Sequence, residues 1–284
     1  MIILFPSSID NPKQVDEEYR LEYDTVKEFS ELKPALFDYS NWYFNKQLKL
    51  NTDVAFENII YRGWMFKPDE YQKFYHLLQA RKADLITAPQ QYNLMHEFPL
   101  VYSKVKEDTP FIETYSFNQK INIKKIISKF PRFLVKDYVK SVKNTSFPKY
   151  FDKNFSQTEF DNWMKVFYKY RGNLLTGGIC IKEYVDLKKY TDNTNEWRVF
   201  YLKNEVLAVL KNSQYNLKVS KPPKKLINKY KNLSSPFYTV DYAELENGRW
   251  IIVETGDGGV SGLPESTDIN DFYNEMDQII NNEN

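Results

Sequence analysis

Apolar residues fall into short runs in the first third of the chain. Four of these runs are typical of buried strands, at 2–5, 35–38, 57–61 and 85–86. Residues 15–32 begin with acidic side chains and carry apolar residues at helical spacing, which predicts a helix. A second helix is predicted over 68–80, where Pro68 opens an acidic first turn. This alternation of strand and helix predicts a small α/β layer.

The pattern changes after residue 130. Further strands are predicted at 133–135, 178–185, 197–201, 206–210, 237–243 and 250–254. Turn residues separate two consecutive pairs of these strands, at 203–205 and at 246–248, and Asn247-Gly248 is a strong hairpin signal. A single long helix is predicted over 155–170. The second half is therefore expected to be mostly antiparallel sheet.

Composition narrows the class of protein. The 284 residues include 39 Lys and Arg against 38 Asp and Glu, which argues against a surface built wholly for nucleic acid. One Cys excludes a disulfide-stapled module. No run approaches the ~20 apolar residues of a spanning helix, and the apolar start is too short for a signal peptide, so we expect a cytoplasmic protein without membrane contact. Aromatic residues, at 17%, require a packed core or several stacking surfaces.

Two strand ends carry candidate nucleotide contacts. Lys136 and Lys140 follow the strand at 133–135 and are either two solvated lysines or two ammonium groups placed over a phosphate chain. The strand at 178–185 ends in Glu183-Tyr184-Val185. Backbone groups there can bind an adenine edge while a side chain covers its face, although a water-facing edge strand has the same pattern.

A third strand carries an arginine between large apolar residues. Alternation puts Glu196, Arg198 and Phe200 on one face of the strand and Trp197 and Val199 on the other. Such an Arg either pairs with a carboxylate or binds an anion, and the sequence favours neither role.

The strongest candidate chemistry lies in the last predicted hairpin. Asp241 and Glu254 end its two strand patterns, so antiparallel pairing brings two mutually repelling carboxylates together, and Mg²⁺ relieves such a pair. The run 254–262 then holds four of the nine Gly residues, a further carboxylate at Asp257, and backbone free to approach a ligand. We expect substrate contacts within it at Gly258 and Ser261. A surface loop rich in turn residues is the alternative.

The first third offers one further candidate. Arg62, beside Gly63 after a strand, reaches a substrate carboxylate or phosphate, or else is structural with its stem on Trp64. The two His residues have no metal-ligand spacing, and with one Cys no zinc site or Cys-His nucleophile is supported. Neither a GxxxxGK[ST] loop nor a GxGxxG motif occurs.

The order of these motifs resembles the ATP-grasp superfamily. More narrowly, it resembles the divergent clade named for its Arg and two Lys, which includes the eukaryotic cell-division-cycle protein that assists assembly of a translation initiation factor. The runs that carry the resemblance are 133–141, 179–187, 196–200, 207–215 and 241–263. The opening strand and the run 61–64 resemble the amino-terminal portion of bacterial and phage members.

The resemblance implies an α+β fold. It comprises an ATP-grasp domain over 111–284, whose two α+β subdomains sandwich the nucleotide, and a small α/β domain over 1–110. The implied site residues are Lys136, Lys140 and Lys182 near the nucleotide, Glu183, Tyr184 and Val185 at the adenine, Arg198 and Lys211 as catalytic groups, Asp241 and Glu254 as Mg²⁺ ligands, and Arg62 and Trp64 as substrate contacts. The family commonly has Asn two residues after the second metal carboxylate; that place is Gly256 here, and Asp257 is the candidate for the missing oxygen.

The implied activity is an ATP-dependent ligase that joins a carboxylate to an amine through an acyl-phosphate. The expected partners are Mg-ATP and a small molecule, peptide or protein that bears the carboxylate. Gly256 favours a second hypothesis, an ATP-bound assembly chaperone or binding module without ligation. A nucleic-acid binder that uses the Lys-rich stretch 218–231, interpreted as a mobile insertion, is a third, and the even net charge counts against it.

Overall fold

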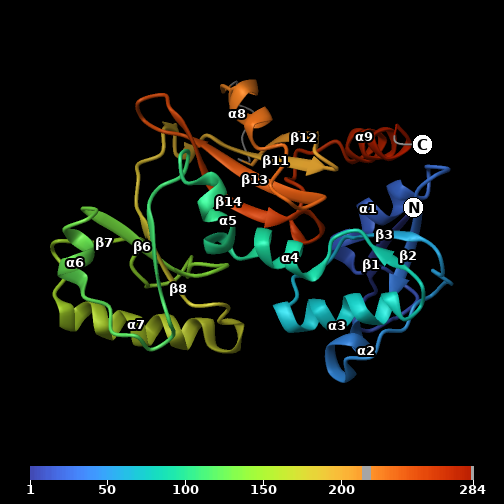
Figure 1. The fold of residues 1–284 in the computed structure, drawn as a ribbon, viewed down its shortest axis with the longest axis horizontal. Coiled ribbons are helices and arrows are strands. Elements are labelled where there is room, and N and C mark those ends of the chain that lie inside the picture. Colours follow the sequence, from blue (N-terminus) through green and yellow to red (C-terminus); the bar gives the residue numbers. More distant parts are fainter. Residues whose placement is uncertain (213–218, 283–284) are drawn as a thin grey trace.

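Four parallel strands form the N-terminal sheet of the computed structural model, which describes residues 1–212 and 219–282 (Figure 1). The sheet order is β2-β1-β3-β4. The elements of this part are β1 (Ile2–Pro6), η1 (Glu17–Tyr19), α1 (Arg20–Val26), β2 (Lys33–Phe37), α2 (Tyr39–Asn45), β3 (Asn58–Tyr61), α3 (Pro68–Gln79), β4 (Asp84–Leu85), α4 (Pro89–His96) and α5 (Phe98–Val105). One face of the sheet packs against α2 and α3 through aromatic residues that include Trp42, Phe66 and Phe74. The predicted α/β layer is confirmed.

The helix predicted over 15–32 is much shorter in the structure. Asp16 caps a 3₁₀ turn by accepting a hydrogen bond from the Glu18 backbone N–H, and α1 ends at Val26. The apolar residues that extended the predicted pattern, Val15 and Leu32, lie in flanking loops and are buried in the same core as α1. Apolar loop residues thus have the spacing of a helix by coincidence. The helix predicted over 15–32 is wrong at both its start and its end.

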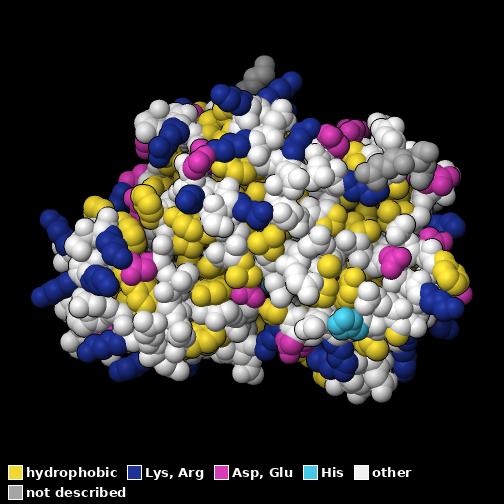
Figure 2. Space-filling view, in the orientation of Figure 1, with side chains coloured by type: hydrophobic (Ala, Val, Ile, Leu, Met, Phe, Trp, Pro, Cys, Tyr) yellow, Lys and Arg dark blue, Asp and Glu magenta, His cyan; other side chains and the backbone are white. Residues whose placement is uncertain are grey.

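The second sheet is antiparallel and has the order β5-β8-β6-β7. Its elements are β5 (Ile112–Tyr115), α6 (Ile123–Ile127), β6 (Arg132–Asp137), β7 (Phe151–Asp152), α7 (Gln157–Arg171), η2 (Gly172–Leu174) and β8 (Ile179–Glu183). Helices α6 and α7 cover one face, where Phe133, Val135 and Ile181 are buried. Residues 121–171 carry twelve Lys and Arg against four Asp and Glu. Figure 2 shows Lys and Arg side chains around the rim of this part of the molecule.

The third sheet is antiparallel and has the order β12-β11-β13-β14, as the two predicted hairpins require. Its elements and their neighbours are β9 (Lys189–Tyr190), β10 (Asn193–Thr194), β11 (Glu196–Leu202), β12 (Glu205–Lys211), α8 (Lys224–Lys229), β13 (Phe237–Glu244), β14 (Trp250–Asp257), η3 (Gly258–Val260) and α9 (Ile269–Asn281). One face buries Trp197, Val240 and Ile252 against α5 and α8. Helix α9 packs on the opposite side, against β12 and α1. The expected α+β architecture is confirmed.

Two β-bulges set the register of this sheet. Tyr201 pairs with Val206 but Phe200 pairs with Ala208, so Leu207 is the extra residue of β12. On β14, Tyr242 pairs with Ile252 but Asp241 pairs with Glu254, so Val253 is the extra residue. Because a one-residue shift moves every later side chain to the other face, each bulge decides which residues face the neighbouring sheet.

The Lys-rich stretch is not a mobile insertion where the structure describes it. Lys218 lies outside the described residues, whereas 219–231 contains α8. Ile227 and Tyr230 are buried there, and their carbonyls accept hydrogen bonds from the Tyr201 and Tyr238 hydroxyls. The Lys side chains of this segment lie on an amphipathic element whose apolar side fills the core beside β11 and β13. Over 1–212 and 219–282, no helix is both long and apolar enough to span a membrane.

Candidate functional site

A cavity of about 810 Å³ lies between the second and third sheets. Lys136 and Lys182 project into it from one face of the second sheet, because β6 and β8 pair Lys136 with Cys180 and Leu134 with Lys182. Arg198, Asp241 and Glu254 line the facing wall. The fold therefore brings together cations from one sheet and carboxylates from the other, as the motif order predicted.

Lys136 and Glu254 form the central ion pair of the cavity. Lys136 Nζ lies 2.5 Å from Glu254 Oε1, and the Lys side chain is 10% exposed. Burial disfavours the charged form of both groups, but each charge stabilises the other. Lys136, followed by Lys140 and Lys182, lowers the pKa of Glu254 to about 2. Glu254 in turn raises the pKa of Lys136. Both groups are therefore charged at neutral pH.

A tight turn holds Lys140 at the cavity. The carboxylate of Asp137 is fully buried and accepts hydrogen bonds from the backbone N–H groups of Val139 and Lys140 at 2.8 and 2.6 Å. Its second oxygen accepts a hydrogen bond from Arg171 Nε. Lys140 itself makes no salt bridge to a described carboxylate. The turn thus fixes an uncompensated ammonium group beside the Lys136–Glu254 pair.

Lys182 is the most buried of these three lysines. Its Nζ donates a 2.6 Å hydrogen bond to the Val253 carbonyl and lies 4.1 Å from the centre of the Phe98 ring. Burial, and then the nearby Lys136, lower the pKa of Lys182 to about 7. The bulge at Val253 therefore does two things: it turns a carbonyl towards Lys182 and aligns Glu254 with Asp241.

The residues predicted at an adenine follow β8 along the cavity wall. The backbone N–H groups of Glu183 and Tyr184 donate to Phe111 and Arg132 carbonyls, so these two donors are already paired. In the described chain, the N–H and C=O of Val185 make no hydrogen bond, and all three residues line the cavity. The Tyr184 ring is held by Tyr150, with ring centroids 4.7 Å apart. An unpaired backbone donor and acceptor at Val185 match the edge of a purine.

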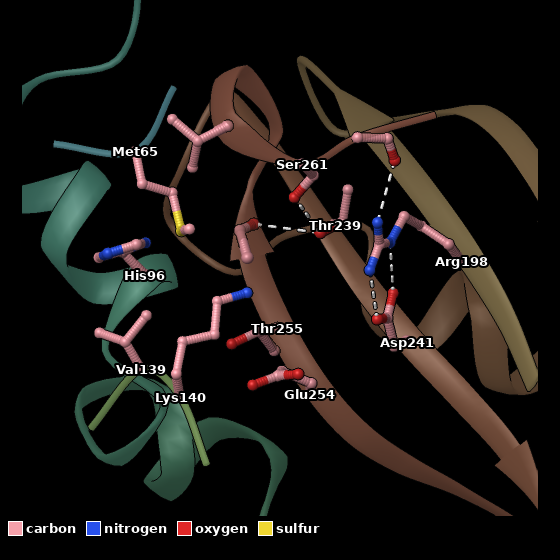
Figure 3. Close-up of a pocket in the computed structure, with 13 residues that line it drawn as sticks. Met65, His96, Val139, Lys140, Arg198, Thr239, Asp241, Glu254, Thr255 and Ser261 are labelled. Carbon is pink, nitrogen blue, oxygen red and sulfur yellow. Dashed lines mark hydrogen bonds and ion pairs between the residues drawn. The ribbon is translucent and has the colours of Figure 1, made fainter. Parts of the chain in front are cut away.

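Arg198 and Asp241 form a second ion pair on the facing sheet (Figure 3). They are directly opposite in the β11–β13 register, and the guanidinium binds the carboxylate through two hydrogen bonds of 2.9 and 2.8 Å. Arg198 Nη1 also donates to the Gly262 carbonyl. The sequence left two roles open for Arg198, pairing with a carboxylate or binding an anion. The two are compatible, because Arg198 pairs with Asp241 in the free protein and also borders both cavities.

Lys211 does not lie with Arg198. A two-residue hairpin turn without a bulge would put Lys211 opposite Glu196, on the Arg198 face. The extra residue at Leu207 shifts the register, so that Lys211 lies opposite Trp197 on the other face of the sheet, and it lines neither cavity described here. The prediction of a catalytic role for Lys211 is therefore corrected.

A smaller cavity of about 110 Å³ adjoins the first and shares Lys140, Arg198, Asp241 and Glu254 with it. Its remaining walls come from several segments, namely Met65, His96, Val139, Thr239, Thr255, Gly256, Val260, Ser261 and Gly262 (Figure 3). His96, at the end of α4, stacks on Tyr92, and burial together with Lys140 lowers the pKa of His96 to about 4. It is neutral at pH 7, with no hydrogen bond from its ring to any described residue.

Arg62 is a structural residue rather than a substrate contact. Its side chain is 1% exposed, and Nε and Nη2 form a bidentate pair with Glu22 at 2.9 and 2.8 Å. Nη1 donates to the carbonyls of Gly258 and Ser261. Gly258 is buried against the Phe237 ring, which leaves no room for a ligand. Arg62 therefore connects the glycine-rich segment 254–262 to the N-terminal sheet through these hydrogen bonds.

Of the two remaining residues predicted to contact substrate, one lies at the small cavity and the other does not. Ser261 lines the small cavity, whereas Trp64 does not; the Trp64 indole donates to Asp16 and its ring packs on Tyr19. Its neighbour Met65, which the sequence did not single out, is the residue that reaches the cavity. The sequence therefore pointed to the right segment, residues 61–65, but to Trp64 in place of Met65.

Asp257 cannot join Asp241 and Glu254. Asp257 lies three positions after Glu254, so strand alternation puts it on the opposite face of β14. Its Oδ1 accepts from the Gly259 N–H, its Oδ2 has no hydrogen-bond partner in the described chain, and burial raises the pKa of Asp257 to about 7. Within 1–212 and 219–282, no three His, Cys, Asp or Glu side chains converge as a metal site. The predicted third carboxylate is corrected.

Sequence reasoning missed Thr239, His96 and Met65. Thr239 was detectable, because it precedes Asp241 by two residues and so shares its strand face. Met65 adjoins the motif at 61–64, which gave a weaker signal. His96 was set aside for lack of metal-ligand spacing, and no local pattern connects α4 with β14.

The sequence matches one family of known proteins. The model of an ATP-grasp domain, for family 3 of the clade named for its Arg and two Lys, matches residues 125–276, more than half of the chain. No curated protein matches the sequence at a significant level.

Several solved structures share the whole fold at low sequence identity. The ATP-grasp ligase PsnB in complex with a minimal precursor is 8% identical, with 98% of each chain covered and a TM-score of 0.59. The macrocyclase MdnC from Microcystis aeruginosa MRC, bound to precursor peptide MdnA, is 11% identical over 97% of this chain and 99% of that chain, with a TM-score of 0.61. A D-alanine–D-alanine ligase from Bacillus anthracis complexed with ATP is 9% identical over 100% and 99%, with a TM-score of 0.61. These similarities establish the ATP-grasp fold.

Proposed function

Because this chain belongs to family 3 of the Arg-and-two-Lys clade of ATP-grasp domains, we propose that it is an ATP-dependent ligase that joins a carboxylate to an amine. One observation carries the proposal: Lys136 and Lys182 face Asp241 and Glu254 across a cavity of about 810 Å³. Cations on one wall suit a polyphosphate, and carboxylates on the other suit the metal that accompanies it. The excess of Lys and Arg over 121–171 adds a field that attracts an anionic nucleotide.

We assign the adenine to the segment after β8. The free N–H and C=O of Val185 would pair with the purine edge, and Tyr184 would contact the ring. Lys136, Lys140 and Lys182 would then face the phosphates. The extent of the match, 125–276, is compatible with an ATP-grasp domain that starts near residue 111 after a small domain of residues 1–110, and we propose that division.

Asp241 and Glu254 fit a magnesium ion. They are directly opposite in register on one face of β13 and β14, and both border the two cavities. Two carboxylates plus nucleotide phosphates are a common set of ligands for Mg²⁺. When bound, the ion would neutralise phosphate charge.

The ion pairs of the free protein imply an exchange of partners. Lys136 and Arg198 neutralise Glu254 and Asp241 in the structure. Phosphate groups that bind Lys136 and Arg198 would release the two carboxylates for the metal. Nucleotide and metal should therefore bind with positive cooperativity. The nucleotide draws the two cations away from the carboxylates that bind the metal, and the metal draws the carboxylates away from the cations that bind the nucleotide.

The smaller cavity is the proposed place of the second substrate. Lys140 and Arg198 border both cavities, so they would flank the γ-phosphate and the carboxylate that attacks it. The attack gives an acyl-phosphate and ADP; an amine then forms the C–N bond as phosphate leaves. The neutral ring of His96 would accept a hydrogen bond from that amine.

We propose a peptide or protein as the carrier of the carboxylate, with a small molecule as the alternative. The structure of PsnB contains a minimal precursor and that of MdnC a precursor peptide, whereas the ligase from Bacillus anthracis is a D-alanine–D-alanine ligase. The small cavity accommodates a side chain rather than a whole peptide, and Met65, 47% exposed, lies at its wall. A peptide would thus lie over this opening with one carboxylate inserted.

The proposal is tested first by nucleotide binding and then by turnover. ADP with Mg²⁺ should raise the melting temperature of the wild type more than that of Asp241→Asn, since this variant keeps the shape of the site but loses a ligand charge. A peptide library should then be scored for phosphate release. The absence of any nucleotide-dependent shift in the wild type would overturn the assignment.

A binding module without ligation is the second candidate. Gly256 contributes no side chain to the metal site, and no third carboxylate converges there in the described chain. The resemblance of the motif order to the cell-division-cycle assembly protein would fit this hypothesis. ATP binding without phosphate release in the peptide screen, together with a stable protein partner, would favour it. Nucleic-acid binding is disfavoured, because Lys229 and Lys231 of the Lys-rich stretch pair with acidic residues.

A further inference from the structure

Two hydroxyl groups lie beside the carboxylates of the proposed metal site. Thr239 and Asp241 are two residues apart on β13 and share a face of the sheet. Ser261 approaches the same face from the segment after η3, and its Oγ lies 2.9 Å from Thr239 Oγ1 (Figure 3). Both hydroxyls line the small cavity together with Asp241 and Glu254. Four oxygen-bearing side chains therefore line one small cavity, although only two of them are acidic.

Gly256 creates the space for this pair. It lies opposite Thr239 in the β13–β14 register. A Cβ at Gly256 would lie 2.8 Å from Ser261 Oγ and 2.9 Å from Thr239 Oγ1, closer than side chains tolerate. Gly256 is not among the residues with positive φ, so its backbone conformation does not require glycine. The contact with the two hydroxyls is what requires it.

The hydrogen bonds of the pair leave acceptor capacity towards the cavity. Ser261 Oγ donates to the Asp257 carbonyl at 2.7 Å, so the proton between the two hydroxyls comes from Thr239. The Gly256 carbonyl lies 3.5 Å from Thr239 Oγ1, at the outer limit of a hydrogen bond, so the 2.9 Å contact with Ser261 is the stronger use of that proton. A hydroxyl has one donor and two acceptor lone pairs. Both lone pairs of Thr239 Oγ1 are then uncommitted, and Ser261 Oγ keeps one. Unused oxygen lone pairs beside two carboxylates are what a hard cation binds.

We propose that the hydroxyls of Thr239 and Ser261 complete the oxygen ligands of the Mg²⁺ held by Asp241 and Glu254, in place of a side chain at position 256. This inference rests on the proposed function, since it concerns the metal of that site. Ser or Thr hydroxyls serve as Mg²⁺ ligands in other nucleotide-binding folds. The glycine is then part of the metal site and not a defect in it.

The test measures how strongly Mg²⁺ promotes ADP binding. Calorimetry gives the ratio of the ADP Kd in EDTA to the ADP Kd in excess Mg²⁺, and this ratio needs neither the substrate nor turnover. Thr239→Val and Ser261→Ala remove one hydroxyl each with little change of shape. The matched control is Thr267→Val, because the Thr267 hydroxyl is buried without a partner in the described chain. Thermal unfolding verifies that each variant is folded.

We expect Thr239→Val or Ser261→Ala to lower the ratio at least about tenfold, the loss typical of a perturbed metal site, while ADP affinity in EDTA stays unchanged. Thr267→Val should match the wild type. If both hydroxyl variants keep the wild-type ratio while Asp241→Asn abolishes it, the inference is overturned and the proposed function stands. If Mg²⁺ does not promote ADP binding to the wild type, both fail.

A second readout locates the metal directly. In crystals of the ADP complex grown with Mn²⁺, the anomalous peak should lie within ligand distance, about 2.1 Å, of at least one of the two hydroxyl oxygens. A peak that contacts the carboxylates and neither hydroxyl would overturn the inference even if the ratios had changed.

Discussion

Replacing Arg62 by Met should destabilise the protein severely and leave ADP binding in EDTA intact, because Arg62 does not line the proposed nucleotide cavity. The Arg62 and Glu22 side chains are 1% and 8% exposed. Arg62 donates to both Glu22 carboxylate oxygens and to two backbone carbonyls, and Tyr273 donates its hydroxyl to the same carboxylate. The substitution keeps the apolar stem but leaves Glu22 as a buried charge without its counter-ion.

The size of the effect follows from that unpaired charge. Removing one partner of a buried ion pair costs about 3–5 kcal/mol in the free energy of unfolding. In a chain of this size each kcal/mol lowers the melting temperature by roughly 2–4 °C, so Arg62→Met should lose about 6–20 °C. The double variant Glu22→Leu, Arg62→Met removes both charges and should be less destabilised than the sum of the single variants.

Urea unfolding followed by circular dichroism measures these differences, and ADP calorimetry follows the site. The matched control is Arg20→Met, which breaks the exposed Arg20–Glu17 pair and should leave the urea midpoint unchanged. If Arg62 bound a substrate, as the sequence also allowed, Arg62→Met would unfold like the wild type and would instead weaken substrate binding. An unfolding midpoint equal to that of the control would therefore refute the structural role.

Three further outcomes are expected. Lys136→Met should weaken ADP binding in EDTA at least about tenfold, because it removes a phosphate contact worth about 1.5–3 kcal/mol; unchanged calorimetric affinity would contradict this. Lys182 has a pKa of about 7 in the free protein, and bound phosphates favour its charged form. Above pH 7 the Lys182 amine therefore takes up a proton when ADP binds, and ADP affinity should fall by up to about tenfold per pH unit. Lys182→Arg remains charged and should flatten this dependence in calorimetry at pH 7, 8 and 9, so an equal slope in both proteins would exclude Lys182 as its source. Asp137→Ala should lower the urea unfolding midpoint, because it removes the buried carboxylate that pairs with Arg171 and accepts from two backbone N–H groups, and a midpoint equal to the wild type would contradict this.

Local sequence signals located most of the strands and the central carboxylates. Gly248 has a φ of 79° and Lys203 and Asn204 both have positive φ, so the predicted turns form where turn residues occur. The second hairpin brings Asp241 close to Glu254, although their direct pairing also requires the bulge at Val253, which the sequence did not reveal. The turns and this proximity depend on residues that are near in sequence, and the sequence therefore predicts them.

The errors have equally specific causes. The bulge at Leu207 moves Lys211 to the other face, and no local pattern marks that extra residue. The carboxylate partner of Arg62, Glu22, lies 40 residues earlier in the chain, and one carbonyl partner, Gly258, lies 196 residues later. Asp257 was grouped with Glu254 by proximity in sequence, although strand parity alone excludes it.

The packing of α9 has a consequence for synthesis of the chain. Ile3, Phe5 and Ile60 on the N-terminal sheet share one core with Phe272 and Met276 of α9. A ribosome produces the sheet first, and that apolar face then waits for about 200 further residues before α9 emerges. Contacts of such sequence separation form slowly, so the part of this core that α9 covers stays exposed to solvent during this interval. A truncation before Ile269 would make that temporary exposure permanent.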